Sequence, residues 1–324
     1  MYVKQLFTTY LCLFSLAIPS LVSAQSGWPS KPITIVVTYP PGGGADAMAR
    51  LIAPKLGEAL GQPVVIENRG GASGQIGAGI VAKAAPDGYT LMLDASSFAV
   101  NPALYSKLAY DSEKAFRPIA VIALFPNVVL VNAQFAPRTL AELISLAQAK
   151  KDSVAYASSG NGSAQHVAGA LFESAAKVEM LHIPYKGGGP ALNDLLAGHV
   201  PLFFGNLAST LQHVQSGKVR ALAVASNRRS AILPDVPSVA ELGLKDAEVY
   251  EWNAVFAPSG TPEAMINKVA AALQMTLDQP EVKARIAQLG GDIQKGGPEA
   301  AQSFIRQQLS LWAKVVKARN IVLE

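Results

Sequence analysis

The sequence predicts an α/β protein whose chain forms two units, each a mostly parallel sheet flanked by helices. Three observations predict this class. Short apolar, β-branched runs alternate with helix-like segments along most of the 324 residues. The alternation restarts with a new apolar strand near residue 126, and the last two helical segments have no strand beside them in sequence. Continuous apolar strands separated by helices are typical of parallel sheets covered on both faces.

The first unit opens with the apolar run ITIVVTY (33–39), which predicts a buried strand. The segment 45–61 has the pattern of the helix that follows it. Further strands are expected at 63–69 and 89–95, with a glycine-rich start to a helix between them at 75–88.

The second unit begins with the expected strand 126–133, and Thr139 is the expected cap of the helix 139–151. Strands at 153–158, 179–185, 200–206, 219–226 and 248–260 continue the pattern. The final helices, 261–291 and 297–320, are expected to return to the first unit. The first domain would then be discontinuous (25–125 plus 251–324), and the second domain (126–250) would be an insertion joined to it by two chain crossings that form a hinge.

The first 24 residues have the pattern of a cleaved secretory signal peptide. Lys4 precedes a short apolar run from Tyr10 to Ile18, and small residues end the segment at Ala24. The run is too short for a membrane anchor. Cleavage after Ala24 would leave 324 − 24 = 300 residues without cysteine, because Cys12 is the only one in the chain. We therefore expect a periplasmic product without disulfides, and a monomer by default.

Composition excludes some classes of partner. The formal net charge is +4, and charged residues make up only 15% of the chain. No Lys/Arg block with interleaved aromatic residues is present, so nucleic acid is not an expected partner.

Four glycine-rich stretches fall where strands give way to helices: 40–46, 69–77, 158–166 and 185–192. A helix start offers unpaired N–H groups and a partial positive charge, and glycine lets the backbone come close to a ligand. One such cluster is more often a tight turn than a site. Four at equivalent junctions favour a small anion held by peptide N–H groups at the carboxyl ends of the strands.

The sequence lacks the motifs of several other kinds of site. GAGIVA (77–82) starts too far beyond the strand for a dinucleotide site, and neither a P-loop nor a G-x-S-x-G elbow occurs. The four histidines do not have metal-ligand spacing. We expect no cofactor and no metal. Two alternatives to a receptor stay open: an exported hydrolase that uses Ser163 and His166, and a structural or adhesive envelope protein without a cleft ligand.

Several long blocks together resemble the Bug/TctC family of periplasmic solute receptors, including WPSKPITIVVTYPPGGGADAMAR, YASSGNGSAQHVAGALF and HIPYKGGGPALNDLLAGHVPLFFGN. The resemblance covers essentially the whole mature chain. It implies a two-domain clamshell of the type II periplasmic-binding class that binds a carboxylate between its domains and is not an enzyme. It also implies partners, namely membrane permease subunits of a tripartite tricarboxylate transporter or a sensor.

The resemblance implies ligand-binding residues by position. In the first domain these are Pro41, Gly42, Gly43, Gly44, Asp46, Ser96 and Ser97. In the second domain they are Ser158, Ser159, Gly160, Asn161, Gly162, Ser163, His166, Tyr185, Lys186, Gly187 and Asn206.

Within this set, Asp46 is expected to orient its loop, and His166 to bond to loop backbone. Lys186 would either pair with a distal carboxylate or extend into solvent. The family often has Asp where this chain has Gly205, which implies either a site less hostile to a second negative charge or room for a bulkier ligand. Backbone amides read charge and shape, so the identity of the carboxylate is not predicted.

Overall fold

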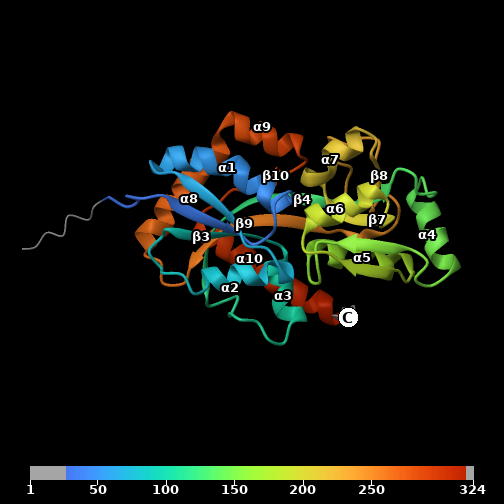
Figure 1. Ribbon diagram of the computed structural model, residues 1–324, viewed down its shortest axis with the longest axis horizontal. Coiled ribbons are helices and arrows are strands. Elements are labelled where there is room, and N and C mark those ends of the chain that lie inside the picture. The colour runs from blue at the N-terminus through green and yellow to red at the C-terminus, as the bar shows by residue number, and fades with distance from the viewer. Residues whose placement is uncertain (1–26, 319–324) are drawn as a thin grey trace, which may run out of the picture.

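The computed structural model of this chain describes residues 27–318, and the expected signal peptide (1–24) lies outside the described residues. Strands and helices alternate along the chain, and the strands form one curled sheet with helices on both faces (Figure 1). The predicted α/β class is confirmed.

One part of the sheet contains β2 (Val64–Asn68), β1 (Ile33–Val37), β3 (Thr90–Ala95), β9 (Tyr250–Pro258) and the first half of β4 (Phe116–Asn132). The short β10 (Asp292–Ile293) also pairs with β4. β1 runs parallel to β2 and β3, whereas β9 runs antiparallel to β3 and β4. We call these strands the first sheet part.

The second sheet part contains the second half of β4 with β7 (Leu202–Asn206), β8 (Val219–Val224), β5 (Ala155–Ser158) and β6 (Leu181–Pro184). β5 is parallel to β6 and β7, and β4 is antiparallel to β7 and β8. The sheet is therefore mixed: its parallel pairs lie toward the outer strands, and the antiparallel pairs surround β4 and β9.

β4 connects the two sheet parts without interruption. It pairs with β9 as far as Pro126, which lies opposite Tyr250, and with β7 from Asn127 onward. The sequence pattern predicts a strand only from residue 126, so the predicted strand start is wrong by ten residues. Two prolines, Pro118 and Pro126, obscure the strand pattern, because proline cannot donate to a ladder. The register also shifts between Pro118 and Ala120.

Helices cover both faces of the first sheet part. α1 (Gly44–Leu60), α8 (Glu263–Asp278) and α9 (Pro280–Gln288) lie on one face, and α2 (Gln75–Val81), α3 (Ser97–Leu104) and α10 (Pro298–Ala318) lie on the other (Figure 1). A short 3₁₀ turn, η1 (Ala72–Gly74), precedes α2. The long helix expected at 261–291 is broken before Pro280, where proline occupies the first position of a new helix.

The second sheet part is covered by α4 (Leu140–Ala149), α5 (Ala164–Ala176), α6 (Gly188–Ala197) and α7 (Leu207–Gln215), and η2 (Lys245–Ala247) precedes β9. α4 and α5 pack in one apolar cluster, and α6 and α7 pack in another. No helix in the described part of the chain combines the length and hydropathy that a membrane span needs.

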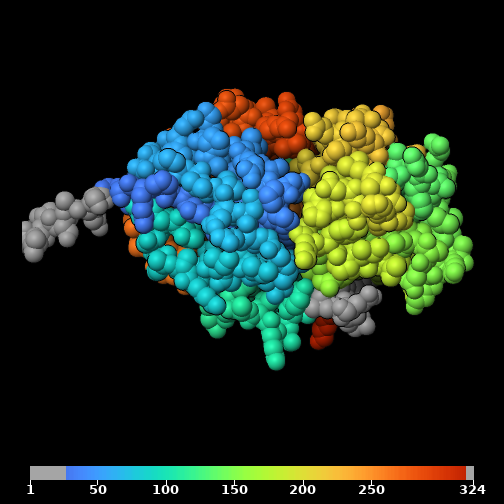
Figure 2. Space-filling view, in the orientation of Figure 1, coloured from blue at the N-terminus to red at the C-terminus, as the bar shows by residue number. Residues whose placement is uncertain are grey.

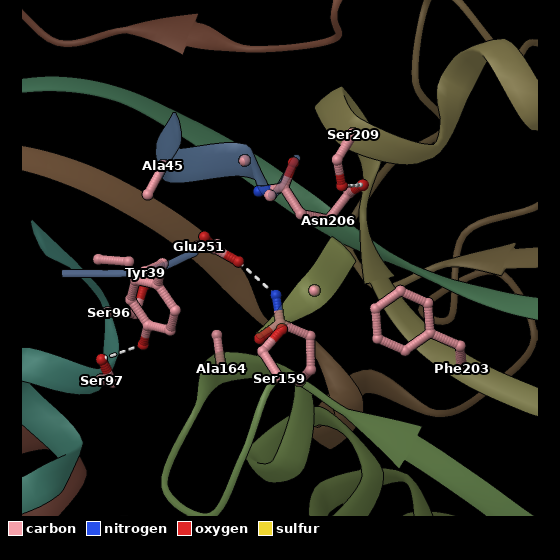
Figure 3. Close-up of a pocket in the computed structure, with 15 residues that line it drawn as sticks. Tyr39, Ala45, Ser96, Ser97, Ser159, Ala164, Phe203, Asn206, Ser209 and Glu251 are labelled. Carbon is pink, nitrogen blue, oxygen red and sulfur yellow. Dashed lines mark hydrogen bonds between the residues drawn. The ribbon is translucent and has the colours of Figure 1, made fainter. Parts of the chain in front are cut away.

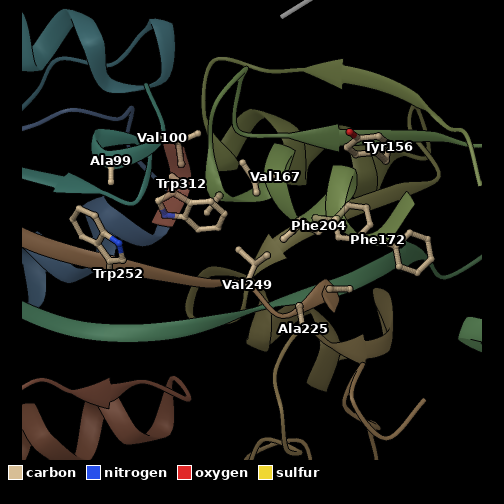
Figure 4. Packing of buried hydrophobic residues seen from close by; sticks show 14 of the residues in the cluster. Ala99, Val100, Tyr156, Val167, Phe172, Phe204, Ala225, Val249, Trp252 and Trp312 are labelled. Atoms are coloured by element: carbon tan, nitrogen blue, oxygen red, sulfur yellow. The ribbon is translucent and has the colours of Figure 1, made fainter. Parts of the chain in front are cut away.

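One buried cluster extends across both sheet parts (Figure 4). Trp252 and Trp312 belong to it on one side, and Phe172 and Phe204 on the other. The indole nitrogens of Trp252 and Trp312 both donate to the side-chain oxygen of Gln308, at 3.1 and 3.2 Å. This shared acceptor fixes α10 against β9 next to the point where the chain passes between the sheet parts.

Candidate ligand-binding site

A cavity lies where the two sheet parts meet (Figure 3). The space-filling view shows their surfaces, blue to cyan on one side and yellow to green on the other, in contact along a narrow seam (Figure 2). The cavity is small, about 20 Å³, which is little more than one water molecule needs. It is lined by fifteen residues: Tyr39, Gly43, Gly44, Ala45, Ala95, Ser96, Ser97, Ser159, Ala164, Gln165, Gly188, Phe203, Asn206, Ser209 and Glu251.

Five helices begin at this cavity. The lining includes Gly44 at the start of α1, Ser97 of α3, Ala164 of α5, Gly188 of α6 and the cap residue of α7. Each helix start carries a partial positive charge and N–H groups without intrahelical partners. Neither α1 nor α6 has a side-chain cap. None of the fifteen lining residues is Lys, Arg or His. The cavity is therefore suited to an anion held by peptide dipoles.

The loop before α1 is held by Asp46, which is buried. Its carboxylate accepts from Gly42 N at 3.1 Å, from Arg50 Nε at 3.0 Å and from Asn68 Nδ2 at 2.9 Å. Burial raises the pKa of Asp46, but these bonds more than offset it and hold the pKa below its usual value. Asp46 does not line the cavity. It fixes the loop from behind, which is the orienting role expected from its position in the first turn.

The loop between β5 and α5 is held by side chains at its two ends that accept from its backbone N–H groups. Gly162 N donates to His166 Nδ1 at 3.1 Å, and Gly160 N donates to Ser158 Oγ at 3.1 Å. Ser158 Oγ also contacts His182 Nε2 at 2.7 Å. The rings of His166 and His182 stack with centroids 4.2 Å apart. Burial lowers the pKa of His166 to about 4 and that of His182 to about 3, so both rings are neutral near pH 7.

The geometry of Ser163 and His166 does not form a nucleophile and base. Ser163 Oγ accepts from the backbone N of His166 at 3.2 Å and caps α5. The His166 Nδ1 atom that could serve as a base already accepts from Gly162 N. An activated serine needs its hydroxyl within reach of a free base nitrogen. Here Ser163 Oγ and His166 Nδ1 both accept from backbone N–H groups.

Glycines bring the two sheet parts close together at the seam. A Cβ at Gly187 would lie 2.5 Å from Pro40 Cγ, and one at Gly189 would lie 3.0 Å from the Pro41 carbonyl oxygen. A Cβ at Gly44 would lie 3.0 Å from Asn206 Cγ. The glycine clusters therefore do more than form turns: they allow loops of the first sheet part to touch loops of the second.

A second set of contacts crosses the seam at the Asn161 carbonyl oxygen. The Ser73 hydroxyl donates to it, and Tyr105 Oη donates to it at 3.1 Å. Ser73 has φ +51°, an uncommon backbone state for a residue other than glycine. Asn101 Nδ2 donates to the Ser73 carbonyl at 3.0 Å and supports that state.

Asn206 presents a buried amide donor at the cavity. Its Oδ1 accepts from Ala208 N at 2.8 Å and caps α7, which fixes the orientation of the amide. Its Nδ2 atom is buried and completes no hydrogen bond of normal geometry, and Glu251 is the acceptor beside it. A buried donor without a full hydrogen bond is costly.

Two buried acids lie at or beside the cavity. Glu251 lines it, is 6% exposed, and accepts from the Gln165 side-chain amide (Figure 3). Burial raises its pKa to about 7, although Gln165 and the neighbouring Asn206 amide oppose the rise. Asp94 lies behind the cavity and accepts from Thr38 Oγ1 and Ala95 N, both at 2.7 Å. Burial also raises the pKa of Asp94 to about 7, and the charge of Glu251 adds to this effect.

The structure brings only some of the expected site residues to the cavity. The lining contains Gly43, Gly44, Ser96, Ser97, Ser159 and Asn206. The other expected residues are not among the lining residues: Pro41, Gly42, Asp46, Ser158, Gly160, Asn161, Gly162, Ser163, His166, Tyr185, Lys186 and Gly187. Tyr185 Oη donates to Asp194 at 2.7 Å, and Lys186 is exposed.

Sequence reasoning missed several lining residues, notably Tyr39, Gln165 and Glu251. The Tyr39 hydroxyl bonds to the Ser97 hydroxyl inside the cavity wall. A signal for Glu251 existed, because it is an acid within the mostly apolar segment EWNAVFAP. A buried carboxylate costs free energy unless it is hydrogen-bonded, paired or protonated.

The space around Gly205 is filled by side chains of the second sheet part. A Cβ there would meet Leu130, Phe203 and Thr210 side chains within 3.0 Å. The position faces packed side chains, and Gly205 is not among the residues that line the cavity. Here the glycine does not open room for a bulkier ligand.

Comparison with known proteins assigns the chain to a family. A model described as "Tripartite tricarboxylate transporter family receptor" (TctC) matches residues 48–321. Protein BugT of Bordetella pertussis is 37% identical over 305 residues, which is 94% of this chain and 93% of BugT. A protein encoded in the tcbD-tcbE intergenic region of Pseudomonas sp. strain P51 is 38% identical over 89% of this chain and 86% of its own length. This chain belongs to the TctC receptor family.

Solved structures resemble this TctC receptor over nearly its whole length. The periplasmic binding protein BugD superposes with a TM-score of 0.88 at 37% identity, over 92% of this chain and 100% of BugD. MatC from Rhodopseudomonas palustris, solved with bound malate, has a TM-score of 0.85 at 35% identity, over 89% and 100%. An R. palustris protein solved with adipate has a TM-score of 0.88 at 34% identity, over 91% and 99%. The predicted fold of a periplasmic binding protein is confirmed, and TctC members are solute receptors.

Proposed function

We propose that this chain is a periplasmic receptor that closes on a small organic carboxylate for uptake or sensing. The observation that carries the proposal is the meeting of five helix starts at one cavity whose lining has no cationic side chain. Such a site neutralises an anion with peptide dipoles from both sides of the seam.

The proposal includes two lobes that move. Residues 25–125 with 251–324 would form one lobe and 126–250 the other. The chain first crosses between the sheet parts at Pro126–Asn127, where β4 changes its partner from β9 to β7. It crosses back at Val249–Tyr250. A cavity of about 20 Å³ cannot admit a dicarboxylate. Ligand entry therefore requires the two lobes to move apart. Closure is then a shift of population toward the closed form, which is stabilised by contacts that only this form completes.

Dicarboxylates are the ligand class we favour. Relatives of this fold were solved with malate and with adipate, and Asn206 Nδ2 offers a buried donor in addition to the helix starts. Helix starts on both sides of the seam offer places for a carboxylate.

A hydrolase that uses Ser163 and His166 is the less favoured function, because both groups bond to backbone. Membrane permease subunits of a tripartite transporter, or a sensor, are the partners we propose for the closed receptor. Export through the N-terminal signal would place the receptor in the periplasm.

The test is a thermal-unfolding screen of the purified mature chain against acetate, succinate, malate, adipate and citrate. A ligand present at 100 times its dissociation constant stabilises the folded state by about 2.7 kcal/mol. We expect at least one dicarboxylate to do so, and X-ray scattering to show compaction with the same compound. Absence of any shift across the panel would contradict the proposal.

A further inference from the structure

Glu251 places an acid where the proposed function requires an anion. Its carboxyl lines the cavity, is 6% exposed, and lies on β9 opposite Phe125, next to the point where the chain crosses between lobes. A ligand carboxylate held by the helix starts that line the same cavity would lie close to that carboxyl once the lobes close around it. Two carboxylates that share one buried site cannot both remain ionised.

The groups facing Glu251 offer no positive charge to separate the two acids. Gln165 on α5 and Asn206 before α7 face it from the second sheet part. Asp94 on β3 and Tyr39 after β1 lie near it in the first sheet part. α1 and α6 contribute Gly43, Gly44, Ala45 and Gly188, which have no titratable side chain. No cationic side chain lines the cavity to pair with a second anion beside the ligand.

We propose that Glu251 holds a proton when the ligand carboxylate enters, so that the closed site contains one carboxylic acid hydrogen-bonded to one carboxylate. This inference rests on the proposed function and adds that ligand binding is accompanied by uptake of a proton. Glu251 donates its O–H to the ligand oxygen, and the proton comes from solvent during closure. Gln165 continues to donate to the other Glu251 oxygen. Burial, which raises the pKa of Glu251 to about 7, acts in the same direction.

The direct test is calorimetric titration of the wild-type protein with adipate and with malate between pH 6 and 9, in pairs of buffers that differ in ionisation enthalpy. Both ligand carboxylates are ionised throughout this range. We expect uptake of nearly one proton at pH 8, and a dissociation constant that rises about tenfold per pH unit above pH 7.5. Binding with the same affinity at all pH values and without proton uptake would overturn this inference while leaving the proposed function intact.

Glu251→Gln isolates the residue, because the amide is neutral, similar in shape and able to donate. We expect its affinity to be independent of pH, within threefold of wild type at pH 6 and more than tenfold tighter than wild type at pH 9. Asp94→Asn is the matched control, since Asp94 is the other buried acid nearby and does not line the cavity. It should keep the wild-type pH slope.

Two outcomes would contradict the role proposed for Glu251. Loss of the slope in Asp94→Asn, with the slope retained in Glu251→Gln, would place the proton on Asp94 and overturn the inference. Loss of all binding in Glu251→Gln, with the wild type preferring ligands that carry an amine, would make Glu251 an anionic partner of a cation and overturn it as well. If no panel carboxylate binds the wild type, the proposed function itself fails. Proton uptake by the wild type needs no variant, so a poorly folding variant would not prevent the test.

Discussion

At the scale of single residues, two adjacent glycines at the start of α1, Gly43 and Gly44, have different surroundings. A Cβ at Gly44 would press on the Asn206 amide at 3.0 Å, whereas the nearest atom to one at Gly43 is 4.0 Å away. Gly44→Ala should therefore hold the seam open and weaken carboxylate binding by about tenfold or more, equivalent to ~1.4 kcal/mol.

Gly79→Ala is the control, because a Cβ at Gly79 in α2 would meet only Ala109 Cβ, at 3.9 Å, and Gly79 does not line the cavity. It should bind adipate or malate within about twofold of wild type. Titration calorimetry on the two variants compares them directly. Equal affinities would mean that the contact between Gly44 and Asn206 does not form in the bound state.

The stacked histidines predict that the free energy of unfolding depends on pH. Burial lowers the pKa of His166 to about 4 and that of His182 to about 3, below the value near 6.5 of an unfolded chain. Between about pH 6.5 and 4 the unfolded state binds more protons, so these two residues make stability fall as pH falls through that window.

We expect the ring signals of His166 and His182 to stay at their neutral positions in NMR titrations down to pH 5. His182→Asn should also show a smaller loss of unfolding free energy between pH 6.5 and 4.5 than wild type. The exposed His199 provides the control substitution, His199→Asn. Titration of either buried ring near pH 6.5 would contradict the packing described here.

The sequence predicted the loops of the site better than its walls. Glycine and serine at strand-to-helix junctions have a pattern that can be read, so Gly43, Gly44 and Ser159 were expected. Glu251 lies on β9 and Tyr39 lies two residues beyond β1, and an inward side chain at such positions is indistinguishable from core until the neighbouring strands are placed.

At the scale of elements, α5 depends on its cap. Ser163 Oγ accepts from His166 N at 3.2 Å, and removal of an N-cap hydroxyl costs about 1 kcal/mol. Ser163→Ala should lower the free energy of unfolding in urea by about that amount, and Ser163→Thr should retain most of it. A loss of hydrolytic turnover in Ser163→Ala, at unchanged stability, would favour the alternative function.

The predicted ends of strands and helices were wrong where a proline interrupts the pattern. Pro118 and Pro126 concealed the first half of β4, and Pro280 divides one expected helix into α8 and α9. In each case hydrophobic periodicity continues through the proline, while the hydrogen-bond ladder adapts by a register shift or by a new helix start. Periodicity alone therefore gives the type of element more reliably than its ends.

At the scale of the whole molecule, the contacts at the Asn161 carbonyl should set part of the balance between open and closed forms. Tyr105→Phe removes one of its two donors. One hydrogen bond is worth about 1 kcal/mol, so the dissociation constant for adipate or malate should rise about threefold to tenfold.

X-ray scattering of the same variant should show a smaller fraction of compact molecules at a fixed ligand concentration. Tyr89→Phe serves as the control, because Tyr89 Oη bonds to Ser30 N, far from Asn161 in the sequence and outside the seam contacts. If Tyr105→Phe and wild type compact equally, the carbonyl contact does not contribute to closure.

The overall architecture could be predicted because long blocks in a fixed order identify the family, and the alternation of strands and helices identifies the class. The mixed direction of the central strands could not be predicted, since it depends on β9 returning between β3 and β4. That pairing joins segments more than a hundred residues apart, and local pattern does not encode it.

The indole pair on Gln308 has a practical consequence. Trp252 and Trp312 are two of only three tryptophans in the chain. Both share one acceptor beside the crossing between lobes, and Trp252 directly follows the cavity acid. Any opening that bends β9 would alter the surroundings of both rings, so the unlabelled protein carries a built-in optical reporter with which the rates of ligand capture and release could be timed.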